Sequence, residues 1–149
     1  FEALEQMPKP SVLVMKDVSG APHRVAYAGE VMATLSKRLG AVGMVTDGAL
    51  RDVKEVRELG FHYFMKYPVV SHANFEIVEI GVPVEMDGEV ITTGDILHGD
   101  ANGIVVVPQS VVAGLSDAVK QVRDTEKRTM DFYKSDAFTL ADAKANRGY

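Results

Sequence analysis

The first half of the chain alternates apolar runs with helical patterns, which predicts strands and helices in turn. Residues 11–16 (SVLVMK) and 41–46 (AVGMVT) are short, largely apolar runs that are typical of buried strands. Between these runs, Gly40 suits the end of a helix that we expect over residues 30–39. The apolar residues of that helix recur at helical spacing: Val31, Leu35 and Leu39. The predicted order is therefore strand, helix, strand.

The same order repeats directly afterwards. Asp47-Gly48 is typical of a turn, residues 51–59 have the spacing of a second helix, and Gly60 suits its C-terminal cap. The apolar residues of this helix are Val53, Val56 and Leu59. The next strand is FHYFMK, residues 61–66. Strand–helix–strand units join parallel strands by right-handed crossovers, so both helices should begin at the carboxyl edge of one sheet.

The second half of the chain has a different pattern. Beyond Pro68, short alternating runs predict a β meander or small barrel without helices. Turn residues interrupt these runs at Asp87-Gly88, Gly94, Gly99 and Asn102-Gly103. We interpret Asp95, Asp100 and Asn102 as turn formers, because their side chains stabilise bends and tolerate left-handed backbone.

Both ends of the chain have helical character. FEALEQM is typical of the last turns of a helix that Pro8 and Pro10 end, and its apolar residues Phe1, Leu4 and Met7 share one face. We expect this face to pack on a segment upstream or across a subunit boundary, and an N-terminal portion to precede Phe1.

A last helix should begin near Ser110, a good N-cap. Its apolar residues are Val111, Leu115, Val119 and Val122. The polar tail over residues 135–149 should be loose or reach across a partner. Without an internal repeat or linker, residues 1–149 are expected to form a single α/β domain.

Composition narrows the functional classes. The 149 residues carry a net charge of −5, which disfavours DNA binding and, less firmly, RNA binding. With no cysteine, any metal must take oxygen or imidazole ligands. No apolar run approaches the roughly 20 residues of a membrane span. We expect a soluble, cytoplasmic protein.

The candidate chemistry lies at the starts of the two predicted helices. Glu30 precedes the adjacent pair Arg51-Asp52, with twenty residues between them. An arginine can hold a substrate carboxylate or carbonyl, and an aspartate can bind a hard cation such as Mg²⁺. Gly29 leaves the backbone open to close approach, and the free amides of Val31 and Met32 suit an anion. Together these groups predict a site for a metal and a small oxo-acid.

Each residue also has an ordinary structural explanation. Acidic side chains such as Glu30 and Asp52 complement the dipole at a helix start, and Arg51 can form a surface ion pair of little energetic value. Glu55 is placed to pair with Lys54 or Arg51. The histidines show no paired ligand spacing and are expected at the surface: His23, His62, His72 and His98.

Several separate motifs resemble the RraA-like family. This family includes the class II 4-hydroxy-4-methyl-2-oxoglutarate/4-carboxy-4-hydroxy-2-oxoadipate aldolases and the regulator of ribonuclease activity A. The motifs are Gly29-Glu30-Val31-Met32, the spacing from Glu30 to Arg51-Asp52, Val45-Thr46-Asp47-Gly48-Ala49, and Gly94-Asp95 with Gly99-Asp100-Ala101-Asn102-Gly103 before VVVP. The resemblance spans roughly residues 1 to 130.

The resemblance implies an αββα sandwich, related to swivelling phosphohistidine domains, that assembles as a homotrimer or homohexamer with active sites between subunits. It implies that Asp52 binds the metal, that Arg51 contacts substrate, and that the backbone of residues 29–32 holds the pyruvyl carboxylate. Glu30 would touch the metal through water. Glu126 is the candidate for a further acidic ligand donated by a neighbouring subunit.

The chain departs from the family pattern in two places. Position 30 is glutamate where the aldolases commonly have aspartate, which is a mild chemical change. Residues 131–149 (DFYKSDAFTLADAKANRGY) match no family segment.

The resemblance and the residues together favour a Mg²⁺- or Mn²⁺-dependent pyruvate aldolase, a carbon–carbon lyase with Arg51 and Glu30 as its catalytic residues. Its substrates would be 4-hydroxy-2-oxo acids of the 4-hydroxy-4-methyl-2-oxoglutarate type, and it would also decarboxylate oxaloacetate. The alternative is a non-catalytic regulator that binds a ribonuclease or another protein. A third possibility is the same scaffold acting on another oxo-acid.

Overall fold

The computed structural model describes residues 1–72 and 74–145, and the chain forms two compact units, Phe1–Val107 and Pro108–Tyr149. The first unit holds the buried core. None of the described residues of the second unit is buried, so that unit has no core of its own that would make it an independent domain.

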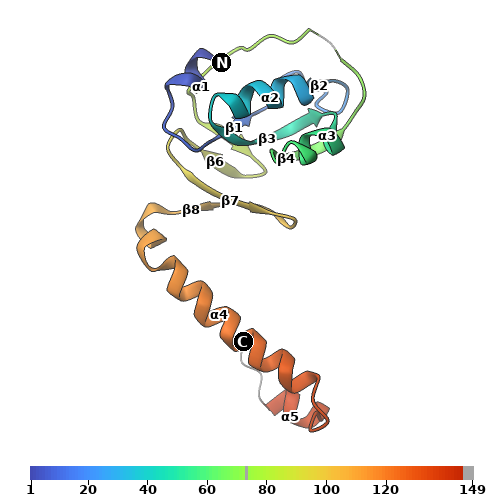
Figure 1. The fold of residues 1–149 in the computed structure, drawn as a ribbon, viewed down its shortest axis with the longest axis vertical. Helices are drawn as coiled ribbons and strands as arrows, with labels where there is room; N and C mark the ends of the chain where they lie inside the picture. The colour runs from blue at the N-terminus through green and yellow to red at the C-terminus, as the bar shows by residue number, and fades with distance from the viewer. Residues whose placement is uncertain (73, 146–149) are drawn as a thin grey trace. The chain divides into compact units, whose positions relative to one another are not determined.

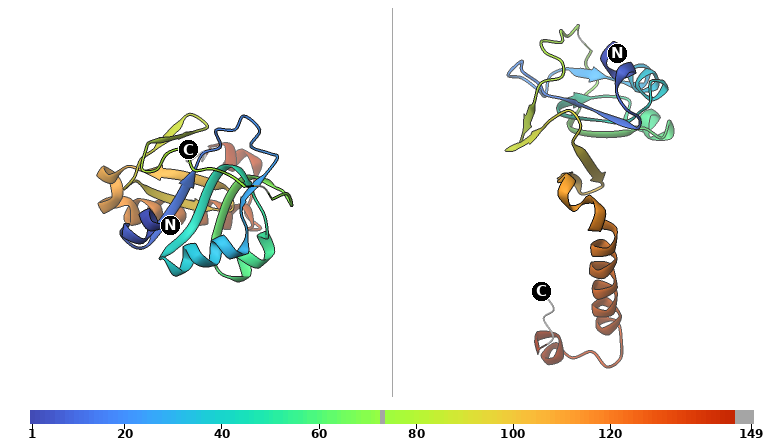
Figure 2. Two further views of the ribbon diagram at one scale, coloured as in Figure 1. Left: turned by 90° about the horizontal axis from the view of Figure 1, so that it is seen from above. Right: turned by 90° about the vertical axis from the view of Figure 1, so that its left-hand side faces the viewer.

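A parallel sheet forms the centre of the first unit. Its strands are β1 (Ser11–Met15), β2 (Ala26–Ala28), β3 (Ala41–Leu50) and β4 (His62–Pro68). β3 is the middle strand: β1 pairs with its first half, β2 pairs with its last residues, and β4 runs along its other edge, all in parallel (Figure 2). The predicted parallel arrangement is confirmed.

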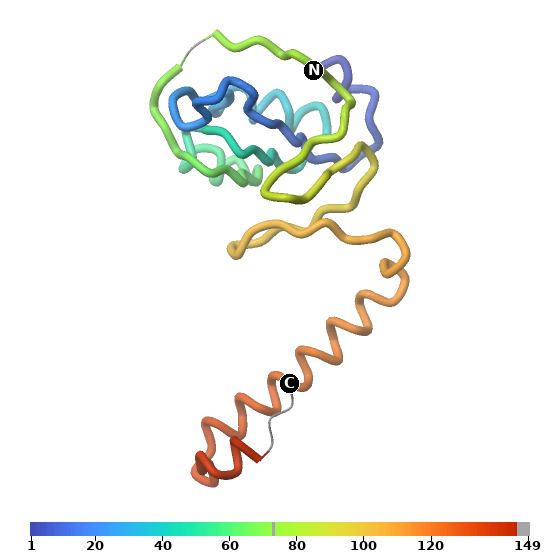
Figure 3. The backbone as a smooth tube through the Cα atoms, turned by 180° about the vertical axis from the view of Figure 1, so that it is seen from behind, coloured from blue at the N-terminus to red at the C-terminus, as the bar shows by residue number. Residues whose placement is uncertain are grey.

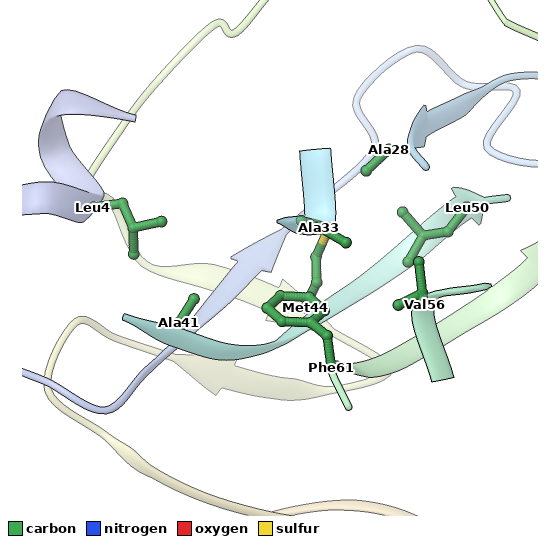
Figure 4. Packing of buried hydrophobic residues seen from close by; sticks show 8 residues of the cluster. All are labelled: Leu4, Ala28, Ala33, Ala41, Met44, Leu50, Val56 and Phe61. Atoms are coloured by element: carbon green, nitrogen blue, oxygen red, sulfur yellow. The ribbon is translucent and has the colours of Figure 1, made fainter. Parts of the chain in front are cut away.

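Three helices accompany this sheet: α1 (Glu2–Gln6), α2 (Glu30–Arg38) and α3 (Val53–Glu58). α2 and α3 lie on one side of the sheet (Figure 1), and the core fills the space between them and the strands (Figure 4). The buried cluster consists of Leu4, Ala28, Ala33, Ala41, Met44, Leu50, Val56 and Phe61. The α/β class predicted from the sequence is confirmed.

The apolar stripe predicted for α2 is wrong in most of its positions. Val31 is 82% exposed and Leu35 is 41% exposed, whereas Ala33 and Ser36 are fully buried. Leu39 alone of the predicted stripe packs against the core. The helix therefore presents small residues to the sheet, which allows a close approach, and leaves two large apolar residues outside.

The predicted turn at Asp47-Gly48 is also wrong, because β3 continues through it to Leu50. Gly48 is required here by packing: a Cβ at this position would overlap the Tyr27 ring and lie 3.1 Å from its hydroxyl oxygen. Asp47 accepts a hydrogen bond from the Asp17 amide at 2.7 Å. A glycine under an aromatic ring was thus mistaken for a turn glycine.

Other expectations for the first unit hold in part. β1 is half-buried and not fully buried. α1 is helical as predicted, and Leu4 packs into the chain's own core. Packing of its neighbours Phe1 and Met7 on an upstream segment or across a subunit boundary stays a prediction. Phe1 and Met7 themselves are exposed.

Two antiparallel hairpins follow an extended segment over residues 74–83 (Figure 3). The strands are β5 (Val84–Met86), β6 (Glu89–Ile91), β7 (Ile96–Asp100) and β8 (Gly103–Val107). The described residues between Pro68 and Val107 contain no helix, as expected, but the hairpins form two separate sheets and no barrel. Asp95 and Asp100 accept backbone hydrogen bonds from Thr92 and Asn102, which confirms their role in turns.

The second unit is helical. It contains a 3₁₀ turn η1 (Gln109–Val111), α4 (Val112–Tyr133) and α5 (Leu140–Ala145). The N-cap of α4 is Val111, so the predicted N-cap at Ser110 is wrong. The predicted loose tail contains α5, and its residues 146–149 lie outside the described residues. Across the described ranges, no helix combines the length and the apolar character that a membrane span requires.

Candidate functional site

The starts of α2 and α3 meet at one edge of the parallel sheet. β2 ends one residue before Gly29, the N-cap of α2, and β3 ends directly before Arg51. The Arg51 amide donates a hydrogen bond to the Ala28 carbonyl at 3.0 Å, which ties the two strand ends together. The predicted convergence of Glu30 with Arg51 and Asp52 is confirmed. The strand that produces it, β2, was missed in the sequence.

The Asp52 carboxylate joins the two helix starts. The backbone amide of Glu30 donates a hydrogen bond to Asp52 Oδ2 at 2.9 Å, and Arg51 Nε lies 3.7 Å from the same oxygen. A carboxylate at a helix N-terminus is favoured by the free amides and by the helix dipole. Asp52 therefore caps α2 from the neighbouring helix, while its Oδ1 takes part in none of the hydrogen bonds or ion pairs found among the described residues.

Asp52 has a strained backbone. Its φ of 58° and ψ of 39° place it in the left-handed region, as the N-cap of α3. Aspartate tolerates this region better than most residues, at a cost of order 1–3 kcal/mol. The Val56 amide binds the Asp52 carbonyl at 2.9 Å and opens α3 from this conformation. Strain of this kind is often retained at functional sites.

Gly29 lies directly against the side chains of Asp52 and Arg51. The residue is buried, and a Cβ added to it would overlap Asp52 Oδ2 and lie 2.8 Å from Arg51 Nε. The expectation that Gly29 leaves the backbone open to close approach of a ligand stays a prediction. The space beside its Cα is filled by the two side chains that were predicted to act there.

Tyr63 belongs to the site and was missed in the sequence. It lies in β4, packs against the buried cluster, and its hydroxyl donates a hydrogen bond to the Gly29 carbonyl at 3.1 Å. Burial and then the negative charge of Asp52 raise the pKa of the Tyr63 hydroxyl to about 12, against the opposing effect of Arg51. The sequence pattern could have indicated Tyr63. Alternation along β4 places Tyr63 and Met65 on the same face of the strand, so the Tyr63 hydroxyl faces the helices.

The remaining predicted residues are placed as follows. The Glu30 side chain is exposed in the first turn of α2, and the amides of Val31 and Met32 lie in the same turn, where a helix provides no partner. Glu55 forms no ion pair among the described residues, so its predicted pairing is wrong. Glu126 is an exposed residue of α4. The four histidines are exposed, as expected.

The donor set suits a hard cation that keeps water or substrate as ligands. No group of three or more acidic or histidine side chains gathers for a metal in the described ranges 1–72 and 74–145. Mg²⁺ commonly binds through one or two carboxylates together with water and substrate oxygens. Asp52 Oδ1 could bind a cation in that mode. The described residues do not supply enough ligands to surround a metal with protein groups alone.

Comparison with known proteins identifies relatives of the chain. A family model described as RraA-like, Aldolase/RraA, matches residues 1–106. A Halalkalibacterium halodurans protein named "Putative 4-hydroxy-4-methyl-2-oxoglutarate aldolase" is 33% identical over 121 residues, which are 80% of this chain and 57% of that protein. The chain thus spans a little over half of the length of this curated relative.

Two solved structures are similar. An uncharacterized protein from Pseudomonas syringae pv. tomato matches with a TM-score of 0.79 and 28% identity, over 97% of this chain and 67% of that one. The RNA-processing inhibitor RraA from Thermus thermophilus matches with a TM-score of 0.63 and 27% identity, over 72% of this chain and 65% of that one.

The close packing at Gly29 generates a first prediction. Gly29→Ala should lower the free energy of unfolding by about 1–3 kcal/mol, because the new methyl group displaces the Asp52 carboxylate from the Glu30 amide that donates a hydrogen bond to it. Its φ of −135° is accessible to alanine, so backbone strain does not contribute. The control is Gly114→Ala in α4, where a Cβ meets nothing within 4 Å and alanine favours the helix. Equal urea midpoints for both variants would contradict the packing argument.

The raised pKa of Tyr63 predicts how stability depends on pH. The unfolded chain releases this phenolic proton near pH 10 and the folded protein near pH 12, so the free energy of unfolding falls as the pH rises through this window. Tyr63→Phe should remove that part of the slope, as measured by urea unfolding between these pH values. Tyr133→Phe is the control, because the Tyr133 side chain is 50% exposed. An unchanged slope in Tyr63→Phe would contradict the assignment.

Proposed function

The chain belongs to the RraA-like family, and from this we propose that it is a divalent-metal-dependent aldolase that releases pyruvate from 4-hydroxy-2-oxo acids. The observation that carries the proposal is the junction at Asp52. One carboxylate holds the start of α2, sits beside the Arg51 guanidinium, and keeps an oxygen free for a cation. The alternative explanation, a helix cap with a surface ion pair, does not account for the left-handed backbone of Asp52.

The proposed substrate site uses positive groups of the chain. The amides of Val31 and Met32 in the first turn of α2 suit the carboxylate of the pyruvyl part, and the helix dipole favours an anion there. The Arg51 guanidinium can hold the 2-oxo oxygen or the carboxylate with two parallel donors. Its side chain is 36% exposed, so it can reach a bound molecule.

The reaction breaks the bond between C3 and C4 of the substrate. The C4 hydroxyl loses its proton and becomes the carbonyl of one product, while the bonding electrons move into the pyruvyl part as an enolate. Protonation of that enolate at C3 gives pyruvate. Arg51 stabilises the negative charge that develops on the enolate oxygen. Glu30, exposed to water at the start of α2, is the proposed acceptor of the hydroxyl proton through water.

A divalent cation, Mg²⁺ or Mn²⁺, would supply Lewis-acid polarisation of the 2-oxo group. Asp52 would hold it directly, Glu30 through water, and Glu126 from a neighbouring subunit of a homotrimer or homohexamer. The same arrangement would decarboxylate oxaloacetate, since that reaction also leaves a pyruvate enolate. Other 2-oxo acids are further candidate substrates, because the groups named here would contact only the pyruvyl part of the molecule.

A second candidate function is binding to a protein partner without chemistry. The similarity to the RNA-processing inhibitor RraA of Thermus thermophilus favours it, and the net charge of −5 suits a basic partner. This function requires neither a metal nor Arg51 at the site, which separates it from the aldolase by experiment.

Arg51→Ala should lower the rate of pyruvate release by roughly a hundredfold or more, because the enolate loses its main cationic partner. Pyruvate is measured with a coupled lactate dehydrogenase assay over a panel of 4-hydroxy-2-oxo acids and oxaloacetate. Arg57→Ala is a matched control, since Arg57 is an exposed arginine of α3, the short helix that begins just after Arg51 and Asp52. A wild-type rate in Arg51→Ala would refute its role.

Removal of divalent cations with EDTA should abolish pyruvate release, and Mg²⁺ or Mn²⁺ should restore it. Asp52→Asn should not recover on addition of metal, whereas Glu55→Gln, an exposed neighbour in α3, should behave like the wild type. If no substrate yields pyruvate with metal present, the binding function replaces the aldolase.

A further inference from the structure

One peptide group at the start of α2 is hydrogen bonded on both of its sides. The carbonyl of Gly29 accepts bonds from the Tyr63 hydroxyl at 3.1 Å and from the Ala33 amide at 3.0 Å. The amide of the same peptide group, which belongs to Glu30, donates to Asp52 Oδ2 at 2.9 Å. Tyr63 and Asp52 are therefore connected through a single peptide unit.

The geometry of a peptide makes this connection effective. The C=O and N–H groups of a trans peptide point in opposite directions in one plane, so a bond to one fixes the direction of the other. A donor on the carbonyl oxygen also polarises the unit and strengthens its N–H as a donor. The Tyr63 hydroxyl thereby orients and strengthens the bond that the Glu30 amide makes to Asp52.

Tyr63 itself is held rigidly. Its strand, β4, pairs in parallel with β3, and its ring packs edge-on against Phe61 with centroids 5.9 Å apart. The side chain has two rotatable bonds before the hydroxyl, so little entropy is lost in holding it. The hydroxyl can thus act as a fixed point for the more exposed helix start.

The Asp52 side chain depends on such a fixed point. Its other contact, Arg51 Nε, is 3.7 Å away, and the two side chains are 36% and 38% exposed, so this ion pair restrains it weakly. The left-handed backbone of Asp52 adds strain that would relax without a restraint. The Glu30 amide supplies the restraint.

We propose that Tyr63 is a positioning residue for Asp52 and acts through the Gly29–Glu30 peptide. It touches neither substrate nor cation. Its consequence for catalysis rests on the proposed function, whereas the coupling between Tyr63 and Asp52 is a property of the folded chain alone.

The test follows the Glu30 amide by ¹H–¹⁵N NMR of the full chain without added metal or substrate. Tyr63→Phe keeps the ring but removes the donor to the Gly29 carbonyl, which weakens the bond from the Glu30 amide to Asp52 without removing it. The Glu30 proton should therefore move upfield, and its hydrogen exchange should accelerate severalfold. The matched control is Tyr27→Phe, because the Tyr27 hydroxyl is buried without a hydrogen-bond partner among the described residues. It should leave the Glu30 amide unchanged.

A coupling measurement separates positioning from general loosening. Asp52→Asn should shift the same amide, and Tyr63→Phe added to it should have a much smaller effect than in the wild type. An unmoved Glu30 amide in Tyr63→Phe would overturn the proposal. So would equal acceleration of exchange at core amides such as that of Val45, which would show a merely structural role.

The outcome is independent of the aldolase assay. If the Glu30 amide depends on Tyr63 while no substrate yields pyruvate, the positioning role stands and the proposed function falls. If pyruvate release depends on Arg51 while the Glu30 amide does not change in Tyr63→Phe, the proposed function stands and the positioning role falls.

Discussion

The bond from the Glu30 amide to the Asp52 carboxylate is the contact on which the candidate site depends. It joins the starts of two helices that are separated by the whole of β3 in sequence. The parallel sheet makes it possible, because β2 and β3 end side by side and release both helices at one edge. Without that bond, Arg51 and Asp52 would be a surface pair just before a short helix.

The same contact explains why α2 does not bury its most apolar side chains. Gly29 has no Cβ, so Asp52 and Arg51 pack directly against it and fix where the helix begins. Once the start is fixed, the helical repeat turns Ala33 and Ser36 toward the sheet. The helix start at Gly29 and the packing of small residues on the sheet are therefore compatible with one orientation of α2.

The sequence predicted whatever depends on local pattern: the order of β1, α2, β3, α3 and β4, the parallel pairing, and the meeting of Glu30 with Arg51 and Asp52. The prediction from sequence failed where a contact between residues far apart in the chain determines the structure. β2 has three residues and no periodicity to detect, and Gly48 looks like a turn residue until the Tyr27 ring covers it. Tyr63 was missed because its role depends on a carbonyl 34 residues earlier in the chain.

The energies at the start of α2 can be compared: the burial of its apolar side chains against the hydrogen bond to Asp52. Burying a valine or leucine side chain is worth about 1.5–3 kcal/mol, and this contribution is largely forgone at Val31, which is 82% exposed. A hydrogen bond to a charged group returns about 1.5–3 kcal/mol, and the left-handed Asp52 subtracts from that return. The local arrangement is therefore no gain in stability for this chain alone. A carboxylate held in place at the expense of stability is what the proposed metal and substrate site would require of Asp52.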